Sequence, residues 1–204
     1  MKKCVFALFL CVSLMIVGPA CAELLTFDTL PPTPYNFGAA IPNGYGGLNW
    51  DNFAYLPGDL YFPPSGYQNG LVSPPNVAFN GYGNPADFWN PNGSPFTFVG
   101  AYFTGAWNDG LNIEVKGLFY GVTIYDYSFT VNTSGPVYFF ADWSGINEVD
   151  FISSGGTPHG FPHGAGTQFA MDNLTVTGPV PEPCTLLLLG SGLVGLVGLR
   201  LRRN

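Results

Sequence analysis

The sequence predicts an all-β protein, a two-sheet antiparallel β-sandwich flanked by an N-terminal signal helix and a C-terminal hydrophobic helix. The 204 residues include 28 glycines and 19 prolines, which mark frequent turns. Aromatic residues make up 16 % of the chain and charged residues only 9 %, the opposite of a disordered composition. No stretch between the two ends combines a helical period with caps.

The N-terminal segment 1–22 reads as a signal peptide. Two lysines precede an apolar run over 4–17, and small residues follow at Ala20 and Ala22. This order predicts export through the Sec translocon and cleavage by signal peptidase after Ala22. A permanent membrane anchor and a lipoprotein site at Cys21 are the alternatives.

The body, 23–179, contains short strands separated by turns. Its 157 residues can bury a core, and it has no cysteine. Apolar and polar residues alternate in its clearest strand, where Leu111, Ile113 and Val115 should point inward. Strands are expected at 24–28, 47–56, 76–80, 95–105, 111–118, 120–131, 137–143, 147–153 and 167–177.

Residues of the usual catalytic sites are scarce in this body. His159 and His163 fall in a Gly- and Pro-rich stretch that reads as a solvated loop. Glu114, Glu148 and Asp150 alternate with apolar residues, which predicts solvated outer sheet faces. The chain is therefore expected not to be an enzyme. The alternative is a polysaccharide-active hydrolase, which would need two of these carboxylates paired in a cleft.

Aromatic side chains are the stronger signal, because their faces can stack on sugar rings. Trp89 is expected in a loop and is the candidate glycan-binding residue. Trp107 could also stack on a sugar, whereas Trp50 and Trp143 are expected in strands and in the core. Core packing is the alternative for each of them.

The second half of the body, 100–177, resembles the jelly-roll sandwiches of secreted carbohydrate-binding modules. The segments 106–111, 145–149 and 169–176 and the strand-turn-strand around Gly117 carry the likeness. In such modules the first and last strands often share a calcium ion.

That resemblance makes Asp28 and Asp172 candidate ligands of a structural calcium ion. Asp28 closes the first strand. The apolar parity of the last strand switches at Asp172–Asn173, as a β-bulge would produce. Calcium prefers clustered oxygen ligands of this kind. The alternative is that both aspartates are solvated or cap turns.

The C-terminal segment 180–204 has three parts in order. They are Pro181-Glu182-Pro183, an apolar run over 184–199, and an arginine cluster of Arg200, Arg202 and Arg203. The run is short for a membrane span, and arginines beyond it mark a cytoplasmic end. These parts resemble the PEP-CTERM sorting signal of Gram-negative bacteria. The resemblance implies exosortase as a partner, transient insertion in the inner membrane, and delivery to the cell surface or exopolysaccharide matrix.

The charge distribution supports export and excludes one class of partner. Between residues 23 and 179 there are twelve acidic residues and one basic residue, Lys116, a net charge of −11. So few cations rule out a nucleic-acid-binding surface. The sequence thus predicts an exported, non-enzymatic surface or matrix protein whose sandwich binds glycan or packs within the exopolysaccharide.

Overall fold

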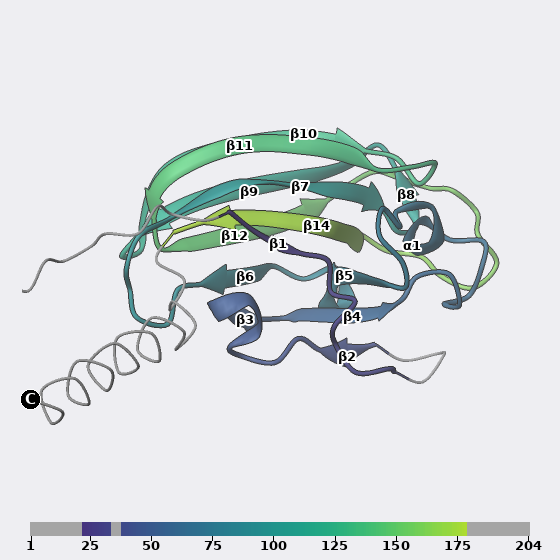
Figure 1. Cartoon of the computed structure of the whole chain (residues 1–204). Coiled ribbons are helices and arrows are strands. Elements are labelled where there is room, and N and C mark those ends of the chain that lie inside the picture. The colour runs from purple at the N-terminus through teal and green to yellow at the C-terminus, as the bar shows by residue number, and fades with distance from the viewer. Residues whose placement is uncertain (1–21, 34–37, 179–204) are drawn as a thin grey trace, which may run out of the picture.

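The computed structural model describes residues 22–33 and 38–178, which form two antiparallel sheets packed face to face (Figure 1). This confirms the predicted all-β sandwich. Within these residues no helix is long and apolar enough to cross a membrane. The predicted signal helix and the C-terminal hydrophobic helix lie outside the described residues.

The first sheet has seven strands in the order β11-β7-β14-β5-β4-β2, with β1 also pairing with β14. Their bounds are β1 Ala22–Leu25, β2 Ala39–Ala40, β4 Phe53–Pro57, β5 Asn76–Asn80, β7 Phe96–Gly105, β11 Val137–Ile146 and β14 Phe169–Thr177. Ala22, the residue expected before the cleavage site, opens β1 and pairs with Thr177.

The second sheet has five strands in the order β10-β9-β12-β6-β3. Their bounds are β3 Asn49–Asp51, β6 Ala86–Trp89, β9 Leu111–Phe119, β10 Val122–Val131 and β12 Glu148–Ser154. A small third sheet joins β8 Asn108–Asp109 to β13 Thr157–Pro158. One helical turn, α1 Gly66–Asn69, and two 3-10 turns, η1 Tyr45–Gly47 and η2 Gly81–Gly83, complete the described elements.

The core between the sheets is aromatic. Phe103 on β7 and Phe151 on β12 are both fully buried, and their ring centroids lie 5.7 Å apart across the interface. Leu111, Ile113 and Val115 are also fully buried, as their alternation predicts. Each such side chain stabilises the fold by about 1.5–3 kcal/mol through burial.

The expected single strand over 47–56 is in fact two strands in different sheets. The break falls at Asn52, whose φ is +50°, a left-handed conformation that turns the chain sharply. The Asn52 side-chain amide donates hydrogen bonds to the carbonyls of Gly81 and Pro85, at 3.2 and 2.8 Å. The chain therefore crosses from the second sheet, at β3, to the first, at β4.

Two outermost strands, β10 and β11, run along the same side of the sandwich (Figure 1). They belong to opposite sheets and do not pair with each other. Because no strand closes the sandwich here, aromatic side chains fill the gap. The Tyr125 and Trp143 rings stack 5.2 Å apart, and those of Phe129 and Phe139 stack 4.7 Å apart.

Candidate functional site

Three carboxylates cluster on the outer face of the second sheet. Asp87 on β6 and Asp150 on β12 are direct cross-strand partners, and Glu148 lies two residues before Asp150 on the same face. One oxygen from each lies within 4.8 Å of the others, so the cluster could hold a cation. Burial, followed by the charge of Asp150, raises the pKa of Asp87 to about 6. Burial and the charge of Glu148 raise that of Asp150 to about 6 as well.

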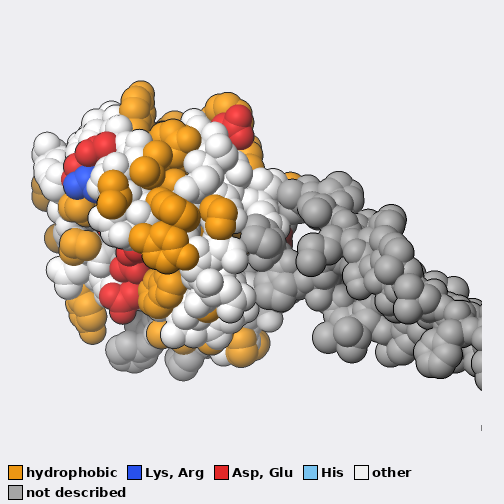
Figure 2. Space-filling model, turned by 90° about the vertical axis from the view of Figure 1, so that its left-hand side faces the viewer, with side chains coloured by type: hydrophobic (Ala, Val, Ile, Leu, Met, Phe, Trp, Pro, Cys, Tyr) orange, Lys and Arg blue, Asp and Glu red, His pale blue; other side chains and the backbone are white. Residues whose placement is uncertain are grey.

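Some carboxylates on this face have a cation beside them and others do not. Figure 2 looks at the end of the sandwich on the left of Figure 1, where acidic side chains form separate groups. The blue side chain is Lys116, the one Lys or Arg in the described part of the chain. Its ammonium lies 3.0 Å from Glu114, and it also stands across the strands from Asp150. Asp87 has no such partner among the described residues.

Trp89 does not lie in a loop, as the sequence led us to expect. It ends β6 and pairs with Glu148 on one side and Asn49 on the other. Its side chain is half-buried on the same face as Asp87. Trp107 is buried in a second, smaller hydrophobic core beside α1, so its ring cannot stack on a sugar. Trp50 is buried as expected.

An open aromatic hollow of about 480 Å³ lies where β10 and β11 face each other. Six of the residues that line it are aromatic, namely Tyr127, Phe129, Tyr138, Phe139, Phe140 and Trp143. Tyr127 and Phe140 are 56 % and 66 % exposed. The Tyr127 ring stacks on Phe139 at 5.8 Å, which holds it in place. No hydrogen bond within the described residues engages the Tyr127 hydroxyl, so it can serve a ligand, whereas the Tyr138 ring packs 4.8 Å from that of Tyr102 on the outer face of the first sheet.

Asp172 is fully buried and accepts four hydrogen bonds. Its Oδ2 accepts from the backbone amides of Val72 and Ser73, both at 2.8 Å. Its Oδ1 accepts from the Asn173 amide at 2.7 Å and the Ser73 hydroxyl at 3.2 Å. The predicted bulge is present, because the register of β14 shifts after Asp172. Burial outweighs these hydrogen bonds and raises the pKa of Asp172 to about 6.

Asp28, the other candidate calcium ligand, contacts the same segment of the chain. Asp28 Oδ1 accepts a hydrogen bond from the Asn76 amide at 3.0 Å, so it too faces a donor. Asp28, just after the first strand, and Asp172, in the last strand, thus anchor the segment 72–76. Their role as shared calcium ligands stays a prediction.

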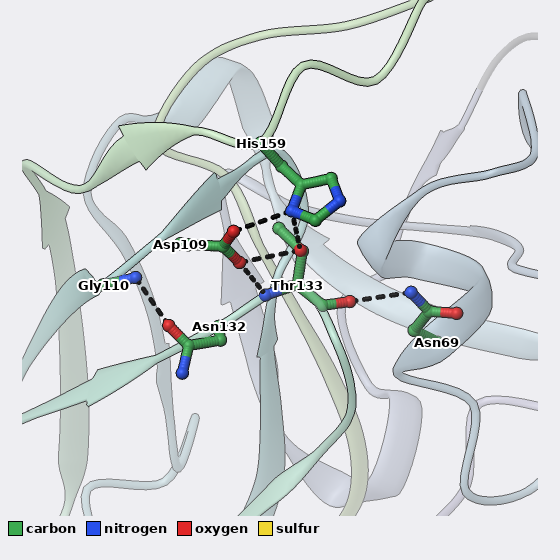
Figure 3. A network of polar contacts seen from close by, with 6 residues as sticks. All are labelled: Asn69, Asp109, Gly110, Asn132, Thr133 and His159. Carbon is green, nitrogen blue, oxygen red and sulfur yellow. Dashed lines mark hydrogen bonds and ion pairs between the residues drawn. The ribbon is translucent and has the colours of Figure 1, made fainter.

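His159 forms part of a polar network at the other end of the sandwich (Figure 3). Its Nδ1 lies 2.7 Å from Asp109 Oδ2 and 3.0 Å from the Thr133 hydroxyl. Asp109 Oδ1 accepts from both the Thr133 amide and hydroxyl, at 2.8 and 2.7 Å. Hydrogen bonds from His159 and Thr133 lower the pKa of Asp109 to about 2.

This network is a structural clasp and not a nucleophilic triad. In a triad the histidine contacts the carboxylate and the hydroxyl through different ring nitrogens, so that it can pass a proton. Here both groups share Nδ1. The clasp instead ties the loop after β13 to β8. His163, from the same loop, is exposed with its ring 5.4 Å from that of Phe62.

Sequence reasoning missed Asp87 and the aromatic hollow. Asp87 lies in a strand too short to recognise, and its neighbours Asp51 and Asp150 come from distant segments. The repeated aromatics of β10 and β11 were a visible signal for the hollow. Their meaning depends on the two strands being edges of opposite sheets.

Comparisons with known proteins identify the C-terminal segment. Residues 179–203 match the family model of the PEP-CTERM protein-sorting motif. The chain therefore carries a PEP-CTERM sorting motif, which contains Pro181, Glu182, Pro183 and the three terminal arginines. These residues lie outside the described part of the structure. No curated protein matches the chain.

Several solved structures are similar to this chain. A DUF4465 family protein from Bacteroides ovatus has a TM-score of 0.46 and 11 % identity, covering 78 % of this chain and 94 % of its own. TmCBM61 in complex with beta-1,4-galactotriose has a TM-score of 0.35 and 10 % identity, and the match covers 66 % of this chain and 93 % of TmCBM61. The arabinose-bound α-L-arabinofuranosidase MgGH51 has a TM-score of 0.39 and 14 % identity, and the match covers 80 % of this chain and 27 % of MgGH51. All three likenesses are distant, so the case for function depends on this chain's own residues.

Proposed function

We propose that this chain is exported, is processed by exosortase, and works as a non-enzymatic surface or matrix protein that binds neutral glycan in the aromatic hollow. The sorting motif at 179–203 supports the route to the surface. In this route the signal peptide 1–22 directs export through the Sec translocon, and the tail holds the precursor in the inner membrane. Exosortase then releases it to the cell surface or exopolysaccharide.

The sorting step has a direct test in cells. Changing Glu182 to Ala, or removing residues 200–203, should leave full-length precursor in the inner membrane, as measured by fractionation and immunoblotting. Asp59→Ala, an exposed loop substitution in the body, is the control and should be sorted normally. Normal surface delivery of both tail variants would contradict the proposed processing.

The exposed aromatic hollow is the observation that supports glycan binding. Its volume falls within the range of small-ligand sites, about 300–1,000 Å³, and such sites combine aromatic walls with a few polar groups. The exposed Tyr127 ring offers a stacking surface for the apolar C–H faces of sugars, and its hydroxyl offers hydrogen bonds. The net charge of −11 over 23–179 disfavours anionic polymers, so the expected ligand is a neutral glycan.

Affinity electrophoresis in gels that contain a neutral polysaccharide tests this proposal. Tyr127→Ala should raise the Kd by about 2- to 12-fold and so weaken retardation, because one stacked aromatic contact contributes about 0.5–1.5 kcal/mol. Tyr82→Ala, an exposed tyrosine outside the hollow, is the matched control. Equal retardation of the Tyr127→Ala variant and the control would contradict binding in the hollow.

A polysaccharide-active hydrolase is the second candidate, and the carboxylate cluster favours it. A carboxyl group with a pKa near 6 can act as a general acid close to neutral pH. Trp89 stands beside Glu148, where a sugar could stack. None of these carboxylates lines the aromatic hollow. Release of reducing ends from polysaccharide by the wild-type chain, lost in Glu148→Gln, would establish this function in place of simple binding.

A further inference from the structure

The turn between β9 and β10 exposes apolar side chains at one end of the sandwich. Phe119 pairs with Val122, so Tyr120 and Gly121 form a two-residue hairpin turn. Both have positive φ, +49° and +77°, as a type I′ turn requires. Asn usually occupies the first of these positions, yet here it is a tyrosine that is 70 % exposed. Val122 is 63 % exposed, and the Phe119 and Tyr120 rings contact each other at 4.6 Å.

This turn lies at the end where the described chain stops before the sorting motif. The Tyr120 amide donates to Asn147 Oδ1 at 2.9 Å, and the Asn147 carbonyl accepts from the Asn90 amide at 2.9 Å. The loop after Asn90 leads into β7, and Gly178 packs against Phe96 at the start of that strand. Figure 2 looks directly at this end, where hydrophobic side chains gather between the acidic groups.

The loops around the turn are uncharged in an otherwise acidic domain. Segments 90–95, 118–125 and 144–147 contain no Asp, Glu, Lys or Arg, although the body carries a net charge of −11. These uncharged loops, with their exposed tyrosine and aliphatic side chains, suit the interface of a lipid bilayer, where aromatic residues concentrate, and the acidic groups of this end lie to either side of them. It would suit a charged polymer poorly.

We propose that this end of the sandwich docks on the surface of the lipid bilayer while the tail holds the precursor in the membrane. The inference rests on the proposed membrane insertion of the apolar run 184–199. From Gly178 to Cys184 the chain can extend by at most about 20 Å. The Phe119–Val122 turn, at the same end as Gly178, is thus held near the headgroups. Tyr82, at the opposite end of strands about 33 Å long, is held farther away.

Quenching of tryptophan fluorescence by brominated phospholipid tests this docking. The full chain is reconstituted in vesicles of phosphatidylethanolamine and phosphatidylglycerol, and flotation verifies that it stays with the lipid. Tyr120→Trp and, in a second variant, Val122→Trp place a reporter on the turn. Tyr82→Trp is the control, because Tyr82 is also an exposed tyrosine with positive φ in a turn.

Docking predicts extra quenching, above that of the wild-type chain, in the Tyr120→Trp and Val122→Trp variants and none in Tyr82→Trp. The extra quenching should persist in high salt, because the contact is apolar. A chain that floats with the vesicles but shows equal quenching at all three positions overturns the docking and leaves the tail's insertion intact. A chain that does not float with the vesicles overturns both the docking and the insertion of the tail. Glycan binding in the hollow is measured separately and is independent of either result.

Discussion

Replacement of Asp87 by Asn should stabilise the folded protein at neutral pH. Asp87 is half-buried, faces the carboxylates of Asp51 and Asp150 across the strands, and has no cation beside it among the described residues. Burial and these charges raise its pKa from 3.8 to about 6 in the fold. Asn has nearly the same shape, carries no charge, and can donate to the buried Asp150 Oδ1, which accepts no hydrogen bond from the described residues.

The size and sign of the effect follow from the pKa. One pKa unit corresponds to 1.36 kcal/mol, so a rise from 3.8 to about 6 sets an upper limit of about 3 kcal/mol. Solvent screening of a half-buried group reduces this to about 1 kcal/mol. Between about pH 4 and pH 6 the folded state binds more protons than the unfolded state at Asp87, so the free energy of unfolding falls as pH rises. The destabilisation caused by the ionised Asp87 carboxylate reaches its full size above about pH 6.

Urea unfolding of the wild-type and variant chains between pH 4 and pH 8 measures this difference. A chelator keeps divalent cations off the carboxylate cluster. Asp87→Asn should match the wild type near pH 4 and exceed it by about 1 kcal/mol at pH 7. Asp59→Asn, in an exposed loop away from the cluster, is the control and should show no such gain. Equal pH dependence in the wild type and Asp87→Asn would refute the reasoning.

Two further substitutions test the anchoring contacts. Asp172→Ala should lower the free energy of unfolding by about 3 kcal/mol, because the amides of residues 72–73 lose their buried acceptor. Anchoring predicts the same loss in calcium and in chelator, whereas a loss confined to calcium would support the expected calcium site. His159→Ala should cost less than about 1 kcal/mol, since its pair with Asp109 is exposed. The destabilisation by His159→Ala should fade as pH falls towards 2, where Asp109 becomes protonated. The substitution should also make the loop that carries His159 easier to cleave, and unchanged proteolysis of that loop would contradict the clasp.

Much of the sandwich was predictable from alternation along the chain. Residues such as Ile113 and Phe151 recur at period two and are fully buried. The bulge after Asp172 was also predictable, from the switch in apolar parity there. Two-residue strands such as β2 and β8 are too short to carry a period, so they became visible only through their partners.

The candidate sites were less predictable, because cross-strand register creates them. Asp51, Asp87 and Asp150 are far apart in sequence and meet because β3, β6 and β12 are neighbours in one sheet. The partners of Asp172 lie about a hundred residues earlier, in a segment without a recognisable element. A residue type can suggest a ligand, but only the fold decides whether a donor or an ion occupies its lone pairs.

Tryptophan fluorescence during a titration with neutral polysaccharide tests glycan binding in the hollow most directly. Trp143 lines the hollow, whereas Trp89 stands on the carboxylate face of the second sheet. Trp143→Phe and Trp89→Phe keep an aromatic ring at each position and remove one reporter apiece. Binding in the hollow predicts a saturable fluorescence change that persists in Trp89→Phe and is largely lost in Trp143→Phe. A change that is lost in Trp89→Phe and kept in Trp143→Phe, or no change at saturating polysaccharide, would contradict it.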